Sequence, residues 1–373
     1  MAWGRAASWR WPFPLVKGKA ALASDLARRT EEPQAPRVFR PTTKSPLGPV
    51  KIASTVSAVA PLLALLAILG ILVHQALPAI KYNGLGFFVH NVWHPGNFYL
   101  QPVTTNGVLH PAQAEYGAWA IIAGTVLSSL IALVIALPAS LGAALVISKL
   151  LGPRVRNALG VFLELLAGIP SVVFGLWGTL TIGPLLSRDI YPIVAKHMPD
   201  VIVLRWFRGS TGAGEGLLTS GIILAAMIIP IIASTSRDLF AQVPTLTEEG
   251  AEALGMTRME VTTKVTVPWV SAGIIGATVL GLARALGETM AVAMVSGSVL
   301  GTLPTNIYST FNTIAATIVT TLDSALIDGT GLAVRTLAEA ALALMLVTLL
   351  ANVGARLLVR KVSTTALPVG RGV

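Results

Sequence analysis

The sequence contains no cysteine and few charged or histidine residues. Charged side chains make up 12% of its 373 residues, and five residues are histidine. The missing cysteine excludes disulfide bonds, thiolate metal sites and cysteine nucleophiles. The sequence also lacks the HExxH motif, which argues against a zinc hydrolase. An ordinary soluble domain has about 25% charged residues, whereas hydrophobic residues reach 54% here. This composition is typical of a polytopic membrane protein.

The positive net charge does not indicate a nucleic-acid-binding protein. The chain has 27 Lys and Arg against 17 Asp and Glu, a net charge of +10. A disordered basic protein needs low hydrophobicity, and a soluble nucleic-acid binder needs charge clustered on a folded surface. Long uncharged stretches argue against both, so we expect the lipid bilayer, and no nucleic acid, as a partner.

Six apolar stretches are long enough to cross a bilayer. A helix needs roughly 20 mostly apolar residues to cross the ~30 Å hydrocarbon layer. Proline within such a helix is tolerated because neighbouring helices satisfy the freed carbonyls. We therefore expect an all-α polytopic membrane protein with six transmembrane helices. The expected spans cover residues 52–80, 118–148, 159–182, 217–236, 270–298 and 332–358.

Lysine and arginine are distributed unevenly between the segments that connect these spans. Residues 1–51, 149–158, 237–267 and the tail from residue 356 together hold 20 of them, and the alternate connecting segments hold 5. Because connecting segments rich in Lys and Arg stay in the cytoplasm, we expect both termini there. Residues 1–51 are expected to be flexible and attracted to anionic headgroups, and residues 362–373 to form a cytoplasmic tail.

The loop 244–268, between the fourth and fifth expected spans, is polar and charged. Thr247 precedes two glutamates and suits a helix start, and Gly255 suits a helix end. On these residues alone, a helix lying at the membrane surface and a docking element for a partner are equally supported. A small apolar face is expected from Ala251, Ala253 and Leu254.

Arg284 and Glu288 lie within the fifth expected span. A spacing of four residues places both on one face of a continuous helix, and a charge in mid-membrane costs about 2.5–3.5 kcal/mol. One interpretation is a structural ion pair that fixes helix packing. The other is a substrate pathway, because the arginine fork donates two parallel hydrogen bonds to phosphate-like oxygens.

The loop resembles the coupling loop of ABC importer permeases. That pattern is Glu-Ala-Ala, a glycine after three residues, and an aliphatic residue nine residues later, before a proline. Gly250 replaces an alanine of the pattern, and Val265 and Val267 are aliphatic exchanges. The resemblance implies short coupling helices that dock in a cleft of an ATPase subunit, with the glycine as a hinge. The matching positions are Glu249, Gly250, Ala251, Gly255 and Pro268.

Two further stretches resemble the PstC subunits of phosphate ABC importers. One is ARALGETMAV, which contains Arg284 and Glu288, and the other is ELLAGIPSVVFGLWG, which begins at Glu164. The resemblance covers roughly residues 50–361 and implies a type I importer permease (MetI-like) fold. It also implies that Arg284 and Glu288 form the intramembrane charged pair of the phosphate pathway.

The resemblance implies the other subunits as well. They are a homologous PstA-like permease, a PstB-like ATPase dimer and an extracytoplasmic PstS-like phosphate-binding protein. The sequence has no GxxxxGK[ST] nucleotide loop, so ATP and magnesium are expected on the ATPase and no cofactor on this chain. We therefore expect a transporter subunit of the bacterial inner membrane and not an enzyme.

Glu164 and Ser171 are secondary candidates for the pathway. Glu164 either faces Arg284 across the bundle or sits at a helix entry near the cytoplasmic interface, and the nearby Arg154 and Arg156 favour the interface. Ser171 follows Pro170, where either a broken helix exposes N–H groups to an anion or a simple proline kink occurs. The kink is favoured.

Several other polar residues are expected to be structural. Arg335 and Glu339 form a second pair with a spacing of four, and near a membrane edge both side chains are expected to reach water. The loop 81–117 contains aromatic residues, including Tyr99 and Tyr116, that suit an interfacial belt.

Three alternatives remain open from the sequence. A permease for another oxyanion, such as sulfate or molybdate, shares the coupling loop but lacks the ARALGETMAV element. A non-transporting membrane scaffold needs neither the loop spacing nor the charges of the fifth span. A secondary transporter needs no loop that docks an ATPase.

Overall fold

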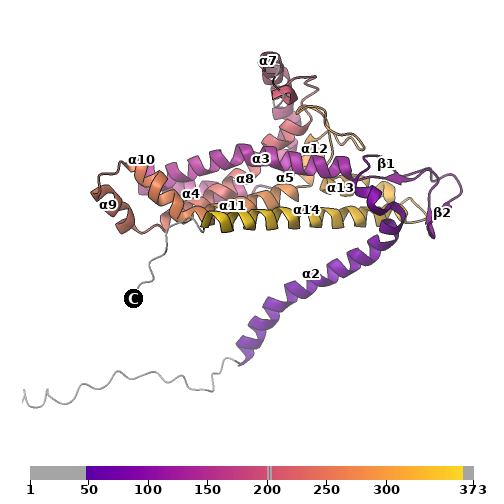
Figure 1. The fold of residues 1–373 in the computed structure, drawn as a ribbon, viewed down its shortest axis with the longest axis horizontal. Helices are drawn as coiled ribbons and strands as arrows, with labels where there is room; N and C mark the ends of the chain where they lie inside the picture. The colour runs from indigo at the N-terminus through magenta and orange to yellow at the C-terminus, as the bar shows by residue number, and fades with distance from the viewer. Residues whose placement is uncertain (1–47, 200, 202–203, 364–373) are drawn as a thin grey trace, which may run out of the picture. The chain divides into compact units, whose positions relative to one another are not determined.

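The computed structural model describes residues 48–199, 201 and 204–363, and its main elements are helices (Figure 1). The expected basic segment 1–51 and tail 362–373 lie almost entirely outside these residues. The chain divides into two compact units, Met1–Leu63 and Ala64–Val373, and the division falls inside helix α2 (Gly48–Asn83). In the first unit the described side chains of this helix are all exposed.

The second unit contains a bundle of four long helices that lie side by side (Figure 1). Helix α3 packs against α8, α8 against α11, and α11 against α14. Small residues such as Ala132, Ala136 and Ala277 are fully or almost fully buried in the core, which allows the helix backbones to approach closely. The helices are α3 (Trp119–Leu145), α8 (Leu217–Ala241), α11 (Val267–Leu286) and α14 (Leu332–Ser363).

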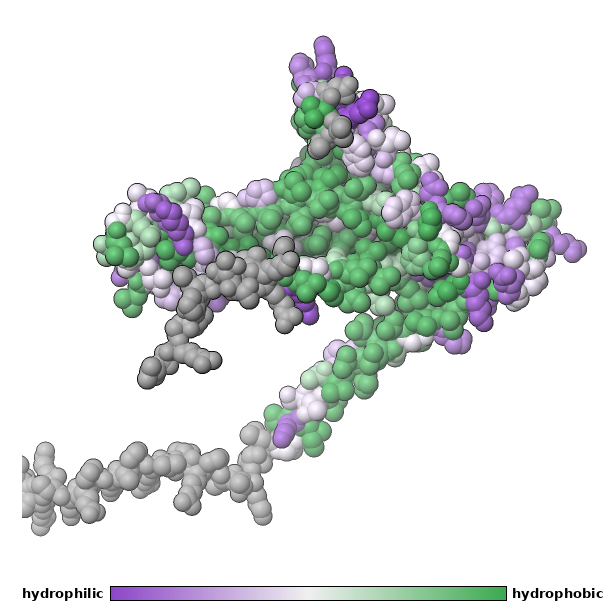
Figure 2. Space-filling view, in the orientation of Figure 1, coloured by the Kyte–Doolittle hydropathy of each residue, from purple (hydrophilic) through white to green (hydrophobic). Residues whose placement is uncertain are grey.

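Apolar side chains cover the visible flank of this bundle, and polar side chains gather toward its ends (Figure 2). Within the described residues, five helices are long and apolar enough to cross a membrane, or six if one bent helix pair counts as a single span. The bundle therefore presents to its surroundings the surface that a bilayer requires.

The third span is sharply broken at Pro170, so the favoured simple proline kink is wrong and the alternative of a broken helix is the one observed. Helix α4 (Pro153–Ala167) and the helical run that begins with α5 (Ser171–Trp177) meet at 87°. Pro170, which has no N–H to donate, lies directly before α5 with an extended backbone (φ −59°, ψ 139°). The run extends beyond the expected residue 182 through η3 (Gly178–Ile182), α6 (Gly183–Leu185), η4 (Leu186–Ile190) and α7 (Tyr191–His197), and η5 (Leu204–Phe207) follows.

The fifth span is also interrupted, so a continuous helix over residues 270–298 is wrong. Helix α11 ends at Leu286, and the chain passes through Gly287 before the short helix α12 (Met290–Val295). A further helix, α13 (Ile314–Ala325), lies in a stretch that we expected to be a loop. The Thr313 hydroxyl accepts a hydrogen bond from the Ala316 N–H at 3.2 Å and caps the start of α13.

The loop between the first two spans folds into a small strand-containing cap. After η1 (Gly84–Phe88), Tyr116 packs its ring edge-on against Trp93 at 5.4 Å and is 4% exposed. Tyr116 therefore does not belong to an interfacial belt, whereas Tyr99 is 99% exposed. Burial, with a smaller contribution from Asp328, raises the pKa of Tyr116. The antiparallel pairs are β1 (Trp93–His94) with β4 (Glu115–Tyr116), and β2 (Val103–Thr105) with β3 (Val108–His110).

Glu339 on α14 is buried, which contradicts the expectation that its side chain reaches water. It is 3% exposed, and its carboxylate accepts a hydrogen bond from the Asn83 side-chain amide at 2.7 Å. Arg335, one turn earlier, is half-buried and forms no ion pair with Glu339 among the described residues. The pair with a spacing of four is therefore replaced by a contact between α14 and the end of α2.

Candidate functional site

Two short helices at one end of the bundle form the loop that resembled a coupling loop. Helix α9 (Thr245–Ala253) ends in a Schellman motif, in which Gly255 donates to Glu252 O at 2.9 Å and Met256 donates to Ala251 O at 3.2 Å. Gly255 has φ +87°, a conformation that suits glycine. The strands lie at the opposite end of the bundle (Figure 1).

The helix starts in this loop differ from the expectation. Helix α9 begins at Thr245, after Pro244, and Thr247 is not its cap. The capping residue is instead Thr257, at the start of α10 (Arg258–Val261), where it forms a capping box with Glu260. The Thr-x-x-Glu pattern at 257–260 was the sequence signal for this cap. From α10 the chain continues through the π-helical turn η6 (Thr262–Thr266) into α11, and Pro268 lies in the first turn of α11.

The loop exposes several large apolar side chains. The exposed fractions of Leu246, Leu254 and Met259 are 80%, 83% and 73%. Ala251 is buried whereas Ala253 and Leu254 are exposed, so the expected common apolar face is wrong. Large apolar side chains left this exposed at the polar end of the bundle are available for contact with a partner.

Glu249 and Gly250 lie on the outer side of α9. Both residues are exposed, and a Cβ atom added at Gly250 would meet nothing within 4 Å. The Glu249 carboxylate has no hydrogen-bond or ion-pair partner within the described part of the chain. Both positions are therefore available to a partner.

Glu248, expected only to favour the start of a helix, also joins α9 to the bundle. Its Oε1 atom accepts hydrogen bonds from Lys149 Nζ at 2.6 Å and from Thr266 Oγ1 at 2.7 Å. Lys149 lies in the π-helical turn η2 (Val146–Leu150) that follows α3. Because these partners are 99 and 18 residues away in the sequence, no local sequence pattern predicts the contacts.

The two segments that follow the breaks, α5 with its continuation in the third span and α12 in the fifth, pack together. A Cβ atom at Gly175 of α5 would lie 2.9 Å from Ala291 Cα of α12, and Thr179 Oγ1 donates to Met294 O at 2.9 Å. The contacts advance in the same direction along both segments, so they run parallel. The break before Ser171 and the break before Met290 therefore lie at the same end of this helix pair.

Arg284 and Glu288 flank the second of these breaks. Arg284 is exposed in the last turn of α11, whereas Glu288 follows the helix end and is half-buried. The Ala291 N–H donates to the Glu288 carboxylate at 3.4 Å. Within the described residues Arg284 and Glu288 form no hydrogen bond or ion pair with each other, and because α11 ends between them at Leu286 the expectation of a shared helix face is wrong. The helix C-terminus favours the cation.

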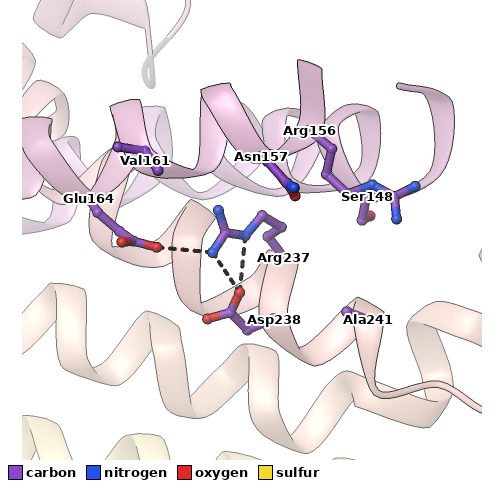
Figure 3. Close-up of a pocket in the computed structure, with 8 residues that line it drawn as sticks. All are labelled: Ser148, Arg156, Asn157, Val161, Glu164, Arg237, Asp238 and Ala241. Carbon is purple, nitrogen blue, oxygen red and sulfur yellow. Dashed lines mark hydrogen bonds and ion pairs between the residues drawn. The ribbon is translucent and has the colours of Figure 1, made fainter. Parts of the chain in front are cut away.

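Glu164 lines an open cavity of about 350 Å³ between α4 and α8 (Figure 3). Its carboxylate accepts from the Arg237 guanidinium at 3.2 Å, and Asp238 accepts from the same group at 2.8 Å. The guanidinium lies directly against Gly160 of α4, where a side chain would overlap it. Glu164 thus has a partner on α8. Ser171, the first residue of α5, is half-buried at the break.

A metal site finds no support in the described residues. They contain no group of three His, Asp or Glu side chains that could hold an ion. The arrangement therefore offers a docking loop at one end of the bundle and an exposed arginine beside two helix breaks.

Comparisons with known proteins identify the family. Residues 136–364 match the family described as binding-protein-dependent transport system inner membrane component. The chain is 60% identical over 301 residues to phosphate transport system permease protein PstC 1 of Mycobacterium tuberculosis, covering 81% of this chain and 89% of the relative. To PstC of Pasteurella multocida it is 36% identical over 291 residues, covering 78% and 84%.

One solved structure is also similar in its backbone. A chain of a bacterial alginate ABC transporter has a TM-score of 0.48 and 16% identity, covering 84% of this chain and 99% of that chain. The family model spans more than half of this sequence, and the expected all-α, multi-pass permease fold is confirmed. The chain therefore belongs to the binding-protein-dependent transport system inner membrane component family and, within it, to the PstC permease proteins.

Proposed function

We propose that this chain is a permease subunit of an ATP-driven phosphate importer in the bacterial cell membrane. It forms the phosphate pathway together with a homologous permease and is coupled to a separate ATPase. The observation that carries the proposal is Arg284, a charged side chain exposed in the last turn of a membrane-spanning helix, directly before a helix break. The names of the PstC relatives supply the substrate.

Arg284 supports a pathway between subunits because exposing its charge to lipid is energetically unfavourable. A charge within the membrane costs about 2.5–3.5 kcal/mol on insertion scales. The exposed side chain is therefore covered by another subunit or by a water-filled pathway. A phosphate passing there offers the paired oxygens that a guanidinium binds. Glu288, next along the chain, adds a negative charge that weakens the hold on the anion and favours release.

The α9–α10 loop supports coupling to an ATPase. Its exposed apolar side chains, the free Glu249 carboxylate and the Gly255 hinge suit a cleft on a cytoplasmic ATPase dimer that binds ATP and magnesium. This assignment places the α9–α10 end and both termini in the cytoplasm. The strand-containing end then faces the extracytoplasmic phosphate-binding protein.

The transport cycle we propose is the one that the resemblance to ABC importer permeases implies. Closure of the ATPase dimer on ATP moves the docked loops and shifts the permease pair from an inward-facing to an outward-facing state. The phosphate-binding protein then delivers phosphate. Hydrolysis opens the dimer, and the permeases return to the inward-facing state by rigid-body rocking and release phosphate.

Phosphate uptake by the reconstituted complex tests the proposal. This chain, its homologous permease and its ATPase are placed in liposomes with the binding protein, and labelled phosphate uptake is measured with and without ATP. Uptake that requires ATP and persists in excess sulfate supports the proposal, and competition by arsenate shows recognition of a tetrahedral oxyanion that, unlike sulfate, still carries protons at neutral pH. Uptake of sulfate or molybdate in place of phosphate would contradict it.

A further inference from the structure

Glu248 connects the α9–α10 loop to two membrane-spanning helices at once. Its Oε1 atom accepts from Lys149 Nζ at 2.6 Å and from Thr266 Oγ1 at 2.7 Å. Lys149 lies at the end of the second span and Thr266 directly before α11 in the fifth span. A displacement of Glu248 therefore acts on both spans.

Both partners of Glu248 lie in π-helical turns. Lys149 belongs to η2 (Val146–Leu150) and Thr266 to η6 (Thr262–Thr266). Such turns are rare inside α-helices and occur mostly at functional sites. Their widened backbone hydrogen bonding makes them places where a helix end rearranges without unfolding the rest of the span.

The other residues of α9 make few contacts with the bundle. Glu249, Gly250 and Glu252 are exposed, and Ala251 contributes one small buried side chain. Thr266 is buried, and the side chains of Lys149 and Glu248 are 26% and 22% exposed. Partial exclusion of water makes this charged contact stronger than one on an open surface.

We propose that Glu248 is a positioning residue that transmits the movement of α9 to the second and fifth spans together. It touches neither phosphate nor ATP. The inference rests on the proposed function, because α9 moves only if the ATPase holds it. Glu249, whose exposed carboxylate has no hydrogen-bond or ion-pair partner within the described residues, serves the ATPase instead.

The test measures the amount of phosphate imported per ATP hydrolysed by the reconstituted complex. Glu248→Gln keeps the size of the side chain but removes the charge that Lys149 binds. We expect the ratio to fall about fivefold while the amount of bound ATPase stays unchanged, which is within the range by which residues between coupled sites alter coupling. Glu252→Gln removes one charge from the same helix without a described partner, and its ratio is expected to match wild type.

A charge exchange tests the direct contact. Lys149→Glu alone and Glu248→Lys alone are expected to uncouple the complex, and the double variant is expected to recover most of the wild-type ratio. Thr266 can accept from the new lysine because a hydroxyl both donates and accepts. An unchanged ratio in Glu248→Gln, or no recovery in the double variant, would overturn the inference.

The controls separate this inference from the proposed function. If the wild-type complex binds no ATPase or imports no phosphate, the proposed function itself is wrong. If Glu248→Gln does not assemble, Thr266→Val and Lys149→Gln test the same link from the bundle side. A wild-type ratio in both would then overturn the role of Glu248.

Discussion

Arg284 is the residue on which the proposed phosphate pathway depends. We expect Arg284→Ala to reduce phosphate uptake about tenfold or more, because a hydrogen bond to a charged group contributes about 1.5–3 kcal/mol. Its side chain forms no hydrogen bond or ion pair within the described residues, so this chain should still fold and bind the ATPase through the distant α9–α10 loop. Uptake in liposomes and co-purification of the ATPase measure the two effects.

Arg284→Lys distinguishes recognition of phosphate by the guanidinium group from attraction by a positive charge alone. Lysine keeps the positive charge but lacks the planar fork, so uptake is expected to lie between that of wild type and of the alanine variant. Wild-type uptake by a well-expressed Arg284→Ala complex would remove Arg284 from the pathway.

Helix α9 and its glycine hinge provide a prediction at the scale of an element. Gly255 has φ +87°, and a residue with a side chain there costs about 1–2 kcal/mol. We expect Gly255→Ala to tilt α9 out of its docked position and to weaken ATPase binding about tenfold, a change of about 1.4 kcal/mol. Affinity of the purified permeases for the ATPase measures it.

Gly250→Ala is the matched control for the hinge. It restores the alanine of the family pattern at a helical position with open space around it. Alanine is favoured over glycine in a helix by about 1 kcal/mol, so affinity is expected to stay the same or rise. Equal losses in both variants would show that Gly255 has no special role.

The packing of α5 against α12 depends on Gly175. A Cβ atom there would lie 2.9 Å from the Ala291 backbone, which has no freedom to rotate away. We expect Gly175→Val to destabilise the purified chain by about 1–3 kcal/mol. Gly276→Val, where nothing lies within 4 Å, should change stability by no more than about 0.5 kcal/mol. Thermal unfolding in detergent compares them, and equal melting temperatures would refute the role of Gly175.

The lengths of the apolar stretches predicted where the membrane spans lie, but they did not predict the breaks inside the third and fifth spans. A window of about 20 residues averages over the breaks at Pro170 and Gly287, and the short segments after them are held by each other and not by local propensity. The break at Gly287 is the reason that Arg284 and Glu288 do not share a face. The helix end at Gly255 could be predicted because its signal lies in neighbouring residues. The partners of Glu248 could not, because only the folded bundle brings them close. The pathway roles of Arg284 and Glu288 stay predictions.

At the scale of the whole molecule, the proposed orientation makes the two ends of the bundle chemically distinguishable. The natural chain has no cysteine, so a single introduced thiol gives an unambiguous label. We expect Tyr99→Cys to react with a membrane-impermeant maleimide in intact cells whose outer layers are removed. Leu254→Cys should react only after the membrane is opened, and the bound ATPase should protect it. The reverse pattern would invert the topology.

The contact between Asn83 and Glu339 has a consequence for how the chain enters the membrane. The two residues are 256 positions apart, and α14 is the last of the described helices, so the ribosome makes Asn83 before Glu339. A carboxylate in a membrane segment opposes insertion, and Asn83 offers it a hydrogen-bond donor that is already in place. We expect the first span to supply this partner when α14 enters the membrane, so a chain truncated before α14 should leave Asn83 without its Glu339 contact.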